Sequence, residues 1–170
     1  MKKLVLAIVF ITIIIPTQAQ NKKEQKNEKN AQAYTEIKAL INSGIYIFES
    51  DWATTQKGNR INLISNPNFL KMDHENATAD LPYFGVSQSP SVGFSGSGGI
   101  EFDGVIKDLK VDFNDKKQKV IIKFSAQNKT ENFNATLAVY RSGNANLSII
   151  SNSRNSISYD GKVSKMKEER

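Results

Sequence analysis

The fold is decided by Leu109-Lys110-Val111-Asp112-Phe113 and by the two segments that follow it, Val120–Phe124 and Phe133–Tyr140. Apolar and polar residues alternate along these segments, and polar turns separate them. Successive side chains of a strand point to opposite faces, so this alternation is typical of antiparallel strands with one buried face. We therefore predict one antiparallel meander whose inner face consists of Leu109, Val111, Phe113, Val120, Ile122, Phe124, Phe133, Ala135, Leu137 and Val139.

Short strand-like segments continue on both sides of this meander. They are Ile45–Trp52, Arg60–Ile64, Phe69–Met72, Ala77–Tyr83, Ile100–Phe102, Leu147–Ile150 and a final Ile157–Tyr159 that Asp160 and Gly161 end in a turn. Before them, Ile37, Leu40 and Ile41 recur at helical spacing, with Gly44 as a cap, which predicts a helix over 31–42. The sequence thus predicts a mainly β fold. We expect an antiparallel sandwich or partly open barrel of about 8–10 short strands, with one N-terminal α-helix packed on it.

The first nineteen residues are typical of a secretory signal peptide. Lys2 and Lys3 precede the apolar run Leu4–Ile15, and Ala19 ends a site that a signal peptidase recognises. The run is shorter than the about 20 residues that a membrane-spanning helix needs. We expect a signal peptide at 1–19, a disordered polar leader at 20–30, a single β-rich domain at 31–163 and a charged tail at 164–170. The mature protein is then exported to the periplasm or released from the cell.

The chain contains no cysteine. This absence excludes disulfides and thiolate metal sites, and we expect neither a lipid anchor nor any stable membrane anchor after signal cleavage. The net charge is +6, but Glu24, Glu28, Glu168 and Glu169 interrupt both basic tails. We interpret the tails as solvated ends and expect no nucleic-acid partner.

Six segments together resemble a known family. In chain order they are Phe48–Ala53, Arg60–Leu63, Asn66–Leu70, Leu81–Gly85, Gly99–Gly104 and Ile157–Gly161. In this combination the chain resembles the secreted bacterial family numbered 4251 among the domains of unknown function, over about 31–163. The resemblance implies a signal peptide, a single domain and a Gram-negative cell envelope, and it brings no activity, substrate or catalytic residue.

Two local patterns invite a chemical interpretation that we do not adopt. The only histidine, His74, lies between Asp73 and Glu75, but consecutive residues of a strand chelate poorly, so we interpret this segment as a polar hairpin tip and expect no metal. The Gly- and Ser-rich stretch 87–99 lacks the Lys-Ser/Thr ending of a phosphate-binding loop. We expect a mobile loop there and no cofactor.

Aromatic residues near this loop supply the candidate binding site. We expect Phe94, within the loop, to contact Tyr83 and Phe84 either as an anchor on the domain or as the cap of a pocket. These three residues are the predicted ligand-binding residues.

Carboxylates supply the only enzymatic option. Glu49 and Asp51 share one strand face by the two-residue period, and so do Glu101 and Asp103. If the two pairs faced each other, they would suit a glycosidase acid and base or a Ca²⁺ site. We name no catalytic residue. The sequence favours a non-enzymatic binding module for an apolar ligand, a peptide or a partner protein; the alternative is a carboxylate-based hydrolase acting on envelope or extracellular glycans.

Overall fold

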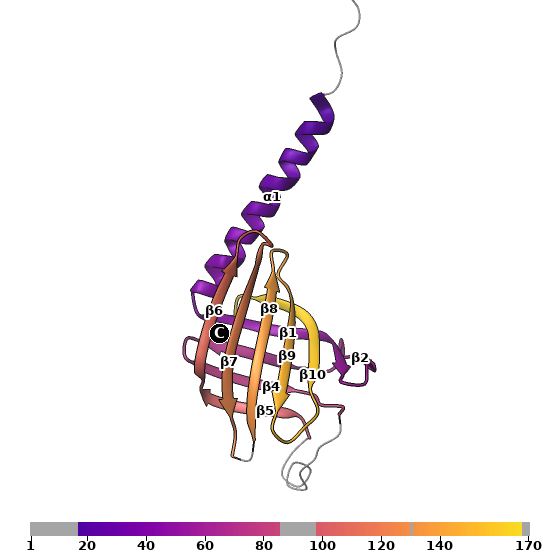
Figure 1. Ribbon diagram of the computed structural model, residues 1–170, viewed down its shortest axis with the longest axis vertical. Coiled ribbons are helices and arrows are strands. Elements are labelled where there is room, and N and C mark those ends of the chain that lie inside the picture. Colours follow the sequence, from indigo (N-terminus) through magenta and orange to yellow (C-terminus); the bar gives the residue numbers. More distant parts are fainter. Residues whose placement is uncertain (1–16, 86–97, 130, 168–170) are drawn as a thin grey trace, which may run out of the picture.

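The protein is a single antiparallel β-sheet curled into a nearly closed barrel, with one helix at its N-terminal side (Figure 1). The computed structural model describes residues 17–85, 98–129 and 131–167. Its elements are α1 (Thr17–Asn42), β1 (Ile45–Thr55), β2 (Arg60–Asn62), β3 (Phe69–Asp73), β4 (Asn76–Leu81), β5 (Ile100–Val105), β6 (Lys107–Asn114), β7 (Lys119–Gln127), β8 (Asn132–Tyr140), β9 (Asn144–Ser151) and β10 (Ile157–Ser164). The predicted mainly β fold with an N-terminal helix is confirmed, and of the two predicted shapes the protein adopts the partly open barrel.

The strands follow one path around the barrel. Their order is β5-β4-β3-β1-β10-β9-β8-β7-β6, and β2 is an extra strand beside β1. In Figure 1, β6 to β9 form the near layer and run across β1, β4 and β5 behind them. Strands β5 and β6 are consecutive in the chain, yet they lie at opposite ends of the path. The barrel is therefore open along a seam between them.

The core fills the inside of the barrel. Alternate residues of β7, β8 and β9 are buried, as predicted for β7 and β8, and they meet the inner residues of β1, β3 and β4. The largest fully buried side chains include Tyr159, Phe48, Phe133, Leu70, Leu81, Ile122, Leu137 and Leu147. Burial of such side chains contributes about 1.5–3 kcal/mol each, so this interior is the main source of stability.

The inner face predicted for β6 is only partly covered. Leu109 and Val111 are each 40% exposed, and Phe113 is only partly buried. The side chain of Val111 does lie on the core side of the sheet, because Val111 pairs with the buried Ile122. However, β6 is the last strand of the path, so no further strand among the described residues covers its side chains.

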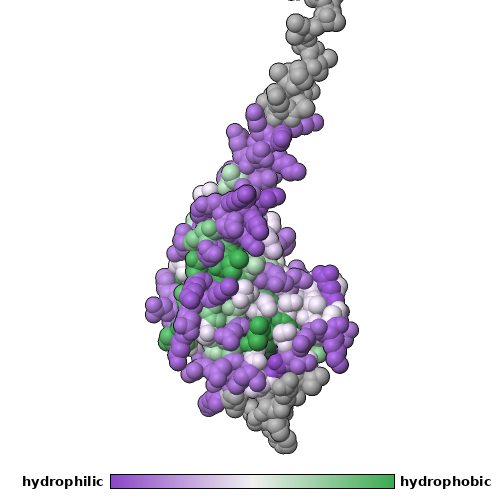
Figure 2. Space-filling view, viewed as in Figure 1, coloured by the Kyte–Doolittle hydropathy of each residue, from purple (hydrophilic) through white to green (hydrophobic). Residues whose placement is uncertain are grey.

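The helix is longer than predicted. It begins at Thr17, and the segment 20–30, predicted to be disordered, is helical, with residues 22–29 exposed. Lys, Gln and Glu are good helix formers, so this segment continues the helix without a packing partner. The helix projects away from the barrel in Figure 1 and its surface is hydrophilic in Figure 2, whereas apolar residues gather on the barrel. Only its last turns join the core, through Tyr34, Ile37 and Ile41.

Candidate functional site

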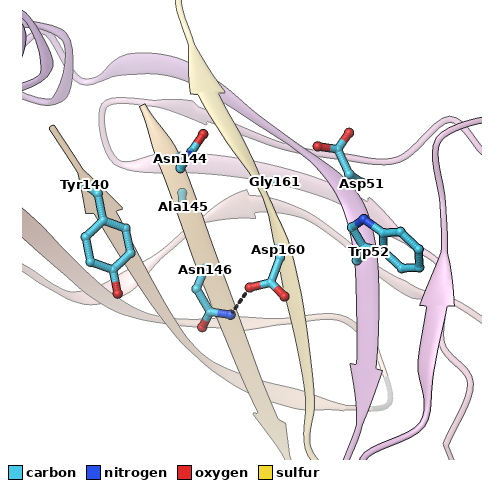
Figure 3. A pocket seen from close by; sticks show the side chains of 8 residues that line it. All are labelled: Asp51, Trp52, Tyr140, Asn144, Ala145, Asn146, Asp160 and Gly161. Carbon is cyan, nitrogen blue, oxygen red and sulfur yellow. Dashed lines mark hydrogen bonds between the residues drawn. The ribbon is translucent and has the colours of Figure 1, made fainter. Parts of the chain in front are cut away.

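A groove lies on the outer surface of the barrel, across β8, β9, β10 and β1. It is a hollow of about 470 Å³ lined by Asp51, Trp52, Tyr140, Asn144, Ala145, Asn146, Asp160 and Gly161. In Figure 3, Tyr140 stands on one side and Trp52 on the other, with polar side chains between them. The hollow therefore has an aromatic side chain at each margin, with the Trp52 ring directed away from Tyr140, and hydrogen-bonding groups between them.

The strand register places the floor of the groove in one row. Trp52 of β1 pairs with Asp160 of β10, and Asp160 pairs with Asn146 of β9. The Asn146 Nδ2 group donates to Asp160 Oδ1 at 2.8 Å (Figure 3). On the other side, Arg60 Nη2 lies 3.8 Å from Asp160 Oδ2, and the Arg60 guanidinium lies 4.6 Å from the centre of the Trp52 ring. Arg60 therefore contacts both the Asp160 carboxylate and the indole ring.

A β-bulge in β1 shapes the Trp52 margin. The register of β1 on β10 shifts between Ser50 and Trp52, so Asp51 is an extra residue. Gly161 lies opposite the bulge, and a Cβ atom there would overlap the carbonyl oxygen of Glu49. The prediction that Gly161 ends the last strand in a turn is wrong: β10 continues to Ser164, and the glycine permits the close approach of β1.

The side chain of Asn68 stabilises this bulge through hydrogen bonds to the backbone of Ser50. The Ser50 backbone N–H donates to Asn68 Oδ1 at 2.9 Å, and Asn68 Nδ2 donates to the Ser50 carbonyl at 2.9 Å. The Leu63 N–H also donates to the Asp51 carbonyl at 2.8 Å. Both Ser50 and Asn68 are buried, so these bonds are shielded from water. Four of the six segments that carry the family resemblance, those containing Trp52, Arg60, Asn68 and Gly161, meet at this bulge.

The predicted carboxylate pairs do not come together. Glu49 and Asp51 lie on β1, whereas Glu101 and Asp103 lie on β5, and two strands separate them. Three spacings of about 4.8 Å put the pairs about 14 Å apart, beyond the reach of a glycosidase acid and base. In addition, Asp103 accepts a hydrogen bond from Thr78 Oγ1 at 2.7 Å. The four side chains are all exposed on the barrel surface.

The end of the barrel at the β7–β8 turn contains a buried ion pair that the sequence did not predict. Glu131, just before β8, and Arg154, just before β10, are both buried. Arg154 Nε lies 2.9 Å from Glu131 Oε2 and 3.0 Å from Oε1, and Arg154 Nη1 donates to the Gly98 carbonyl at 2.7 Å. Ser151 Oγ also donates to Glu131. Neither charged residue lies in an alternating segment, so no periodic signal reveals this pair.

The predicted ligand-binding aromatics lie near this ion pair. Tyr83 is partly buried, its hydroxyl donates to the Asn155 carbonyl at 3.0 Å, and the Arg154 guanidinium lies 5.0 Å from its ring centre. Phe84 is 43% exposed. Phe94 and most of the loop that contains it lie outside the described residues, so their contact stays a prediction. Tyr83 therefore contributes to the packing at this end of the barrel.

A second tyrosine closes the same end. Tyr159 is fully buried, and its hydroxyl donates to the Pro82 carbonyl at 2.8 Å. Burial raises the pKa of Tyr159, so the hydroxyl keeps its proton and its hydrogen bond across the physiological range.

Within the described ranges, no helix is long and apolar enough to cross a membrane. Among the same residues, no group of three or more His, Cys, Asp or Glu side chains is arranged to hold a metal ion. His74 lies in the β3–β4 turn with a positive φ of 56°, consistent with the predicted hairpin tip.

The described residues form an antiparallel barrel with a surface hollow that has an aromatic side chain at each margin. The chain belongs to the family described as a domain of unknown function (DUF4251), whose profile matches residues 28–163. The crystal structure of a DUF4251 family protein from Bacteroides eggerthii DSM 20697 has a similar fold. It is 23% identical in sequence, with a TM-score of 0.62 over 79% of this chain and 89% of that chain. A search of curated proteins found no match.

Proposed function

We propose that this protein is a non-enzymatic binding module of the cell envelope, and that the groove between Tyr140 and Trp52 binds a neutral carbohydrate chain. The observation that carries the proposal is the arrangement of an aromatic side chain at each margin of a floor of amide and carboxylate groups. A sugar ring presents C–H groups on its faces and hydroxyls around its edge. Aromatic rings pack against the C–H groups, and Asn and Asp side chains form hydrogen bonds with the hydroxyls.

The floor suits hydroxyl groups better than an apolar ligand. Asn144 and Asn146 offer both donors and acceptors, and Asp51 and Asp160 offer acceptors. An apolar ligand would remove these groups from water without replacing their hydrogen bonds, which is costly. Ala145, whose side chain is buried, and its pair Gly161 line the hollow between these outward-facing polar side chains.

The groove also disfavours a peptide bound as an added strand. It lies over β8, β9, β10 and β1, which are already paired with their neighbours on both sides. Their backbone groups are therefore engaged, and recognition in the groove depends on side chains. This favours a ligand with its own dense set of donors and acceptors.

Several features favour binding over hydrolysis. Asp51 is exposed, and Asp160 is held by Asn146 and Arg60. A general acid of a glycosidase needs a more enclosed, apolar environment than this open surface provides. We therefore prefer a binding module to the glycan hydrolase.

The single tryptophan makes the proposal directly testable, because all intrinsic tryptophan fluorescence comes from Trp52 in the groove. A panel of neutral oligosaccharides is titrated into the purified protein, and the indole emission is followed. We expect at least one neutral oligosaccharide to shift the emission saturably, with binding confirmed by calorimetry.

Variants locate the binding site. Tyr140→Ala should weaken binding at least about tenfold, which corresponds to about 1.4 kcal/mol. The matched control is Ile150→Ala, because Ile150 is 56% exposed on the outer face of β9 but does not line the groove. Binding that is unchanged in Tyr140→Ala, or a panel with no binder, would contradict the proposal.

A further inference from the structure

Among the described residues, strand β6 leaves an edge open at the seam of the barrel. It is the last strand of the path, residues 107–112 are all exposed, and Leu109 and Val111 are each 40% exposed. Open edges with exposed apolar side chains pair readily with another strand, and proteins usually protect them. This edge therefore requires a partner or a protecting device.

The hydrogen-bonding pattern shows which groups face outward. The Arg141 N–H donates to the Gln118 carbonyl at 3.1 Å, which marks these residues as a hydrogen-bonded pair between β7 and β8. Such pairs alternate along an antiparallel ladder, so Val120 and Ile122 also direct their backbone groups to β8. Val111 pairs with Ile122 and Phe113 with Val120. The backbone groups of Val111 and Phe113 therefore point away from β7, toward the open edge.

The sequence of this edge is complementary to itself. We propose that β6 pairs antiparallel with β6 of a second copy of this chain, with Val111 of both copies on the two-fold axis. In that register Lys110 faces Asp112 of the partner subunit, and the reverse pair forms by symmetry.

The outward backbone of Val111 fits this register. Val111 and Val111 of the partner subunit form a hydrogen-bonded pair, so the neighbouring pairs are the non-hydrogen-bonded kind with a Cα separation of about 4.5 Å. Opposite charges then occupy the closest cross-strand positions, where a pair contributes about 0.2–1 kcal/mol. The exposed apolar side chain of Val111 becomes covered at the same time.

Two features limit the pairing to this segment. At one end, Asp108 has a positive φ of 56° and the register of β6 on β7 shifts between Lys107 and Lys110, so a bulge interrupts the edge. At the other end, Lys38 Nζ of the helix lies 3.0 Å from Asp115 Oδ1. The regular edge between them is short and symmetric, so the expected assembly is a closed dimer.

A single introduced cysteine tests the register, because the chain has no cysteine of its own. In Val111→Cys the two thiols lie opposite each other, with Cα atoms about 5.5 Å apart, within the range of a disulfide. In Leu109→Cys, a residue of equal exposure, the two copies lie four residues apart along the edge, about 13 Å, which no disulfide spans. Under mild oxidation of the purified chain we expect a covalent dimer from Val111→Cys and at least tenfold less from Leu109→Cys. Equal cross-linking of the two variants would overturn the proposal.

Charge reversal tests the same pairing in solution. Sedimentation measured over a range of concentrations should show a dimer that dissociates on dilution. Lys110→Asp and Asp112→Lys should each weaken the dimer at least about tenfold, because each places like charges opposite each other. The double variant should restore the dimer, because residues 110 and 112 of the two copies again carry opposite charges. Lys57→Asp, in the exposed β1–β2 turn, is the control for net charge. A chain that stays monomeric at every concentration, or single variants that dimerise as well as the parent, would overturn the proposal.

Discussion

Strands β8 and β6 carry the same alternating pattern but have different surroundings. Ala135, Leu137 and Val139 of β8 are buried, whereas Leu109 and Val111 of β6 are exposed. The difference comes from position: β8 has a strand on each side and a second layer behind it, while β6 ends the sheet. Alternation therefore identifies the face to which a side chain points, and the topology decides whether that face is covered.

The largest expected effect is at the start of β8, where a buried ion pair replaces apolar packing. Arg154→Met removes the partner of the buried Glu131 and leaves its carboxylate uncompensated. Breaking a buried pair in this way costs about 3–5 kcal/mol. We expect urea unfolding to show a loss of that size, with Arg141→Met, an exposed arginine after β8, close to the parent. A loss below about 1 kcal/mol would show that the pair contributes little.

The second prediction concerns the middle of β8. Leu137 is fully buried, so Leu137→Ala leaves a cavity and should destabilise the protein by about 2–5 kcal/mol. The urea midpoint should fall with an unchanged slope. A midpoint close to that of an exposed-site control would contradict the inward orientation of β8.

The matched substitution on β6 should have a much smaller effect. Val111→Ala removes methyl groups that are already in contact with water, so the expected cost is within about 0.5 kcal/mol. The measurement is urea unfolding at a concentration well below that at which the parent sediments as a dimer. A cost near that of Leu137→Ala would mean that the seam is closed in solution.

The smallest effect is a pH dependence at the upper end of β6. A hydrogen bond from Lys38 lowers the pKa of Asp115 below its ordinary value of 3.8, and Tyr34 adds to the shift. Because the folded-state pKa is the lower one, this contribution to stability is present above pH 3.8 and is lost as the pH falls through the folded-state pKa. The difference in thermal midpoint between the parent and Asp115→Asn should therefore shrink below that pH. A difference that grows on acidification would reverse the assignment.

The sequence predicts the fold where local pattern decides it. The periodicity of β7 and β8 identifies their buried residues correctly, and the spacing of Ile37 and Ile41 locates the part of the helix that packs. The helical segment before Ala31 is missed because it has no apolar periodicity. The exposure of Leu109 and Val111 is missed because the alternation within a strand does not indicate whether that strand lies at the edge of the sheet.

The candidate site depends on register, which the sequence does not contain. Asp51 is recognisable as a carboxylate and Trp52 as a large aromatic, but their meeting with Tyr140 and Asn146 depends on the pairing of β1 with β10. Gly161 illustrates the difficulty, because a glycine after Asp160 is typical of a turn. Here the same residue permits the close approach of another strand, which only the tertiary structure reveals.

The strand order also has a consequence for how the chain acquires its structure. The pairings from β3 to β5 and from β6 to β10 join strands that are neighbours in sequence, so each layer forms from local hairpins. Among the described strands, only the pairing of β1 with β10 joins the two layers, and it brings Ile47 beside Ser164. Such a distant contact carries a large loop-closure entropy and forms slowly. Strand β1 can pair with β10 only after β10 has been synthesised, so the barrel closes late.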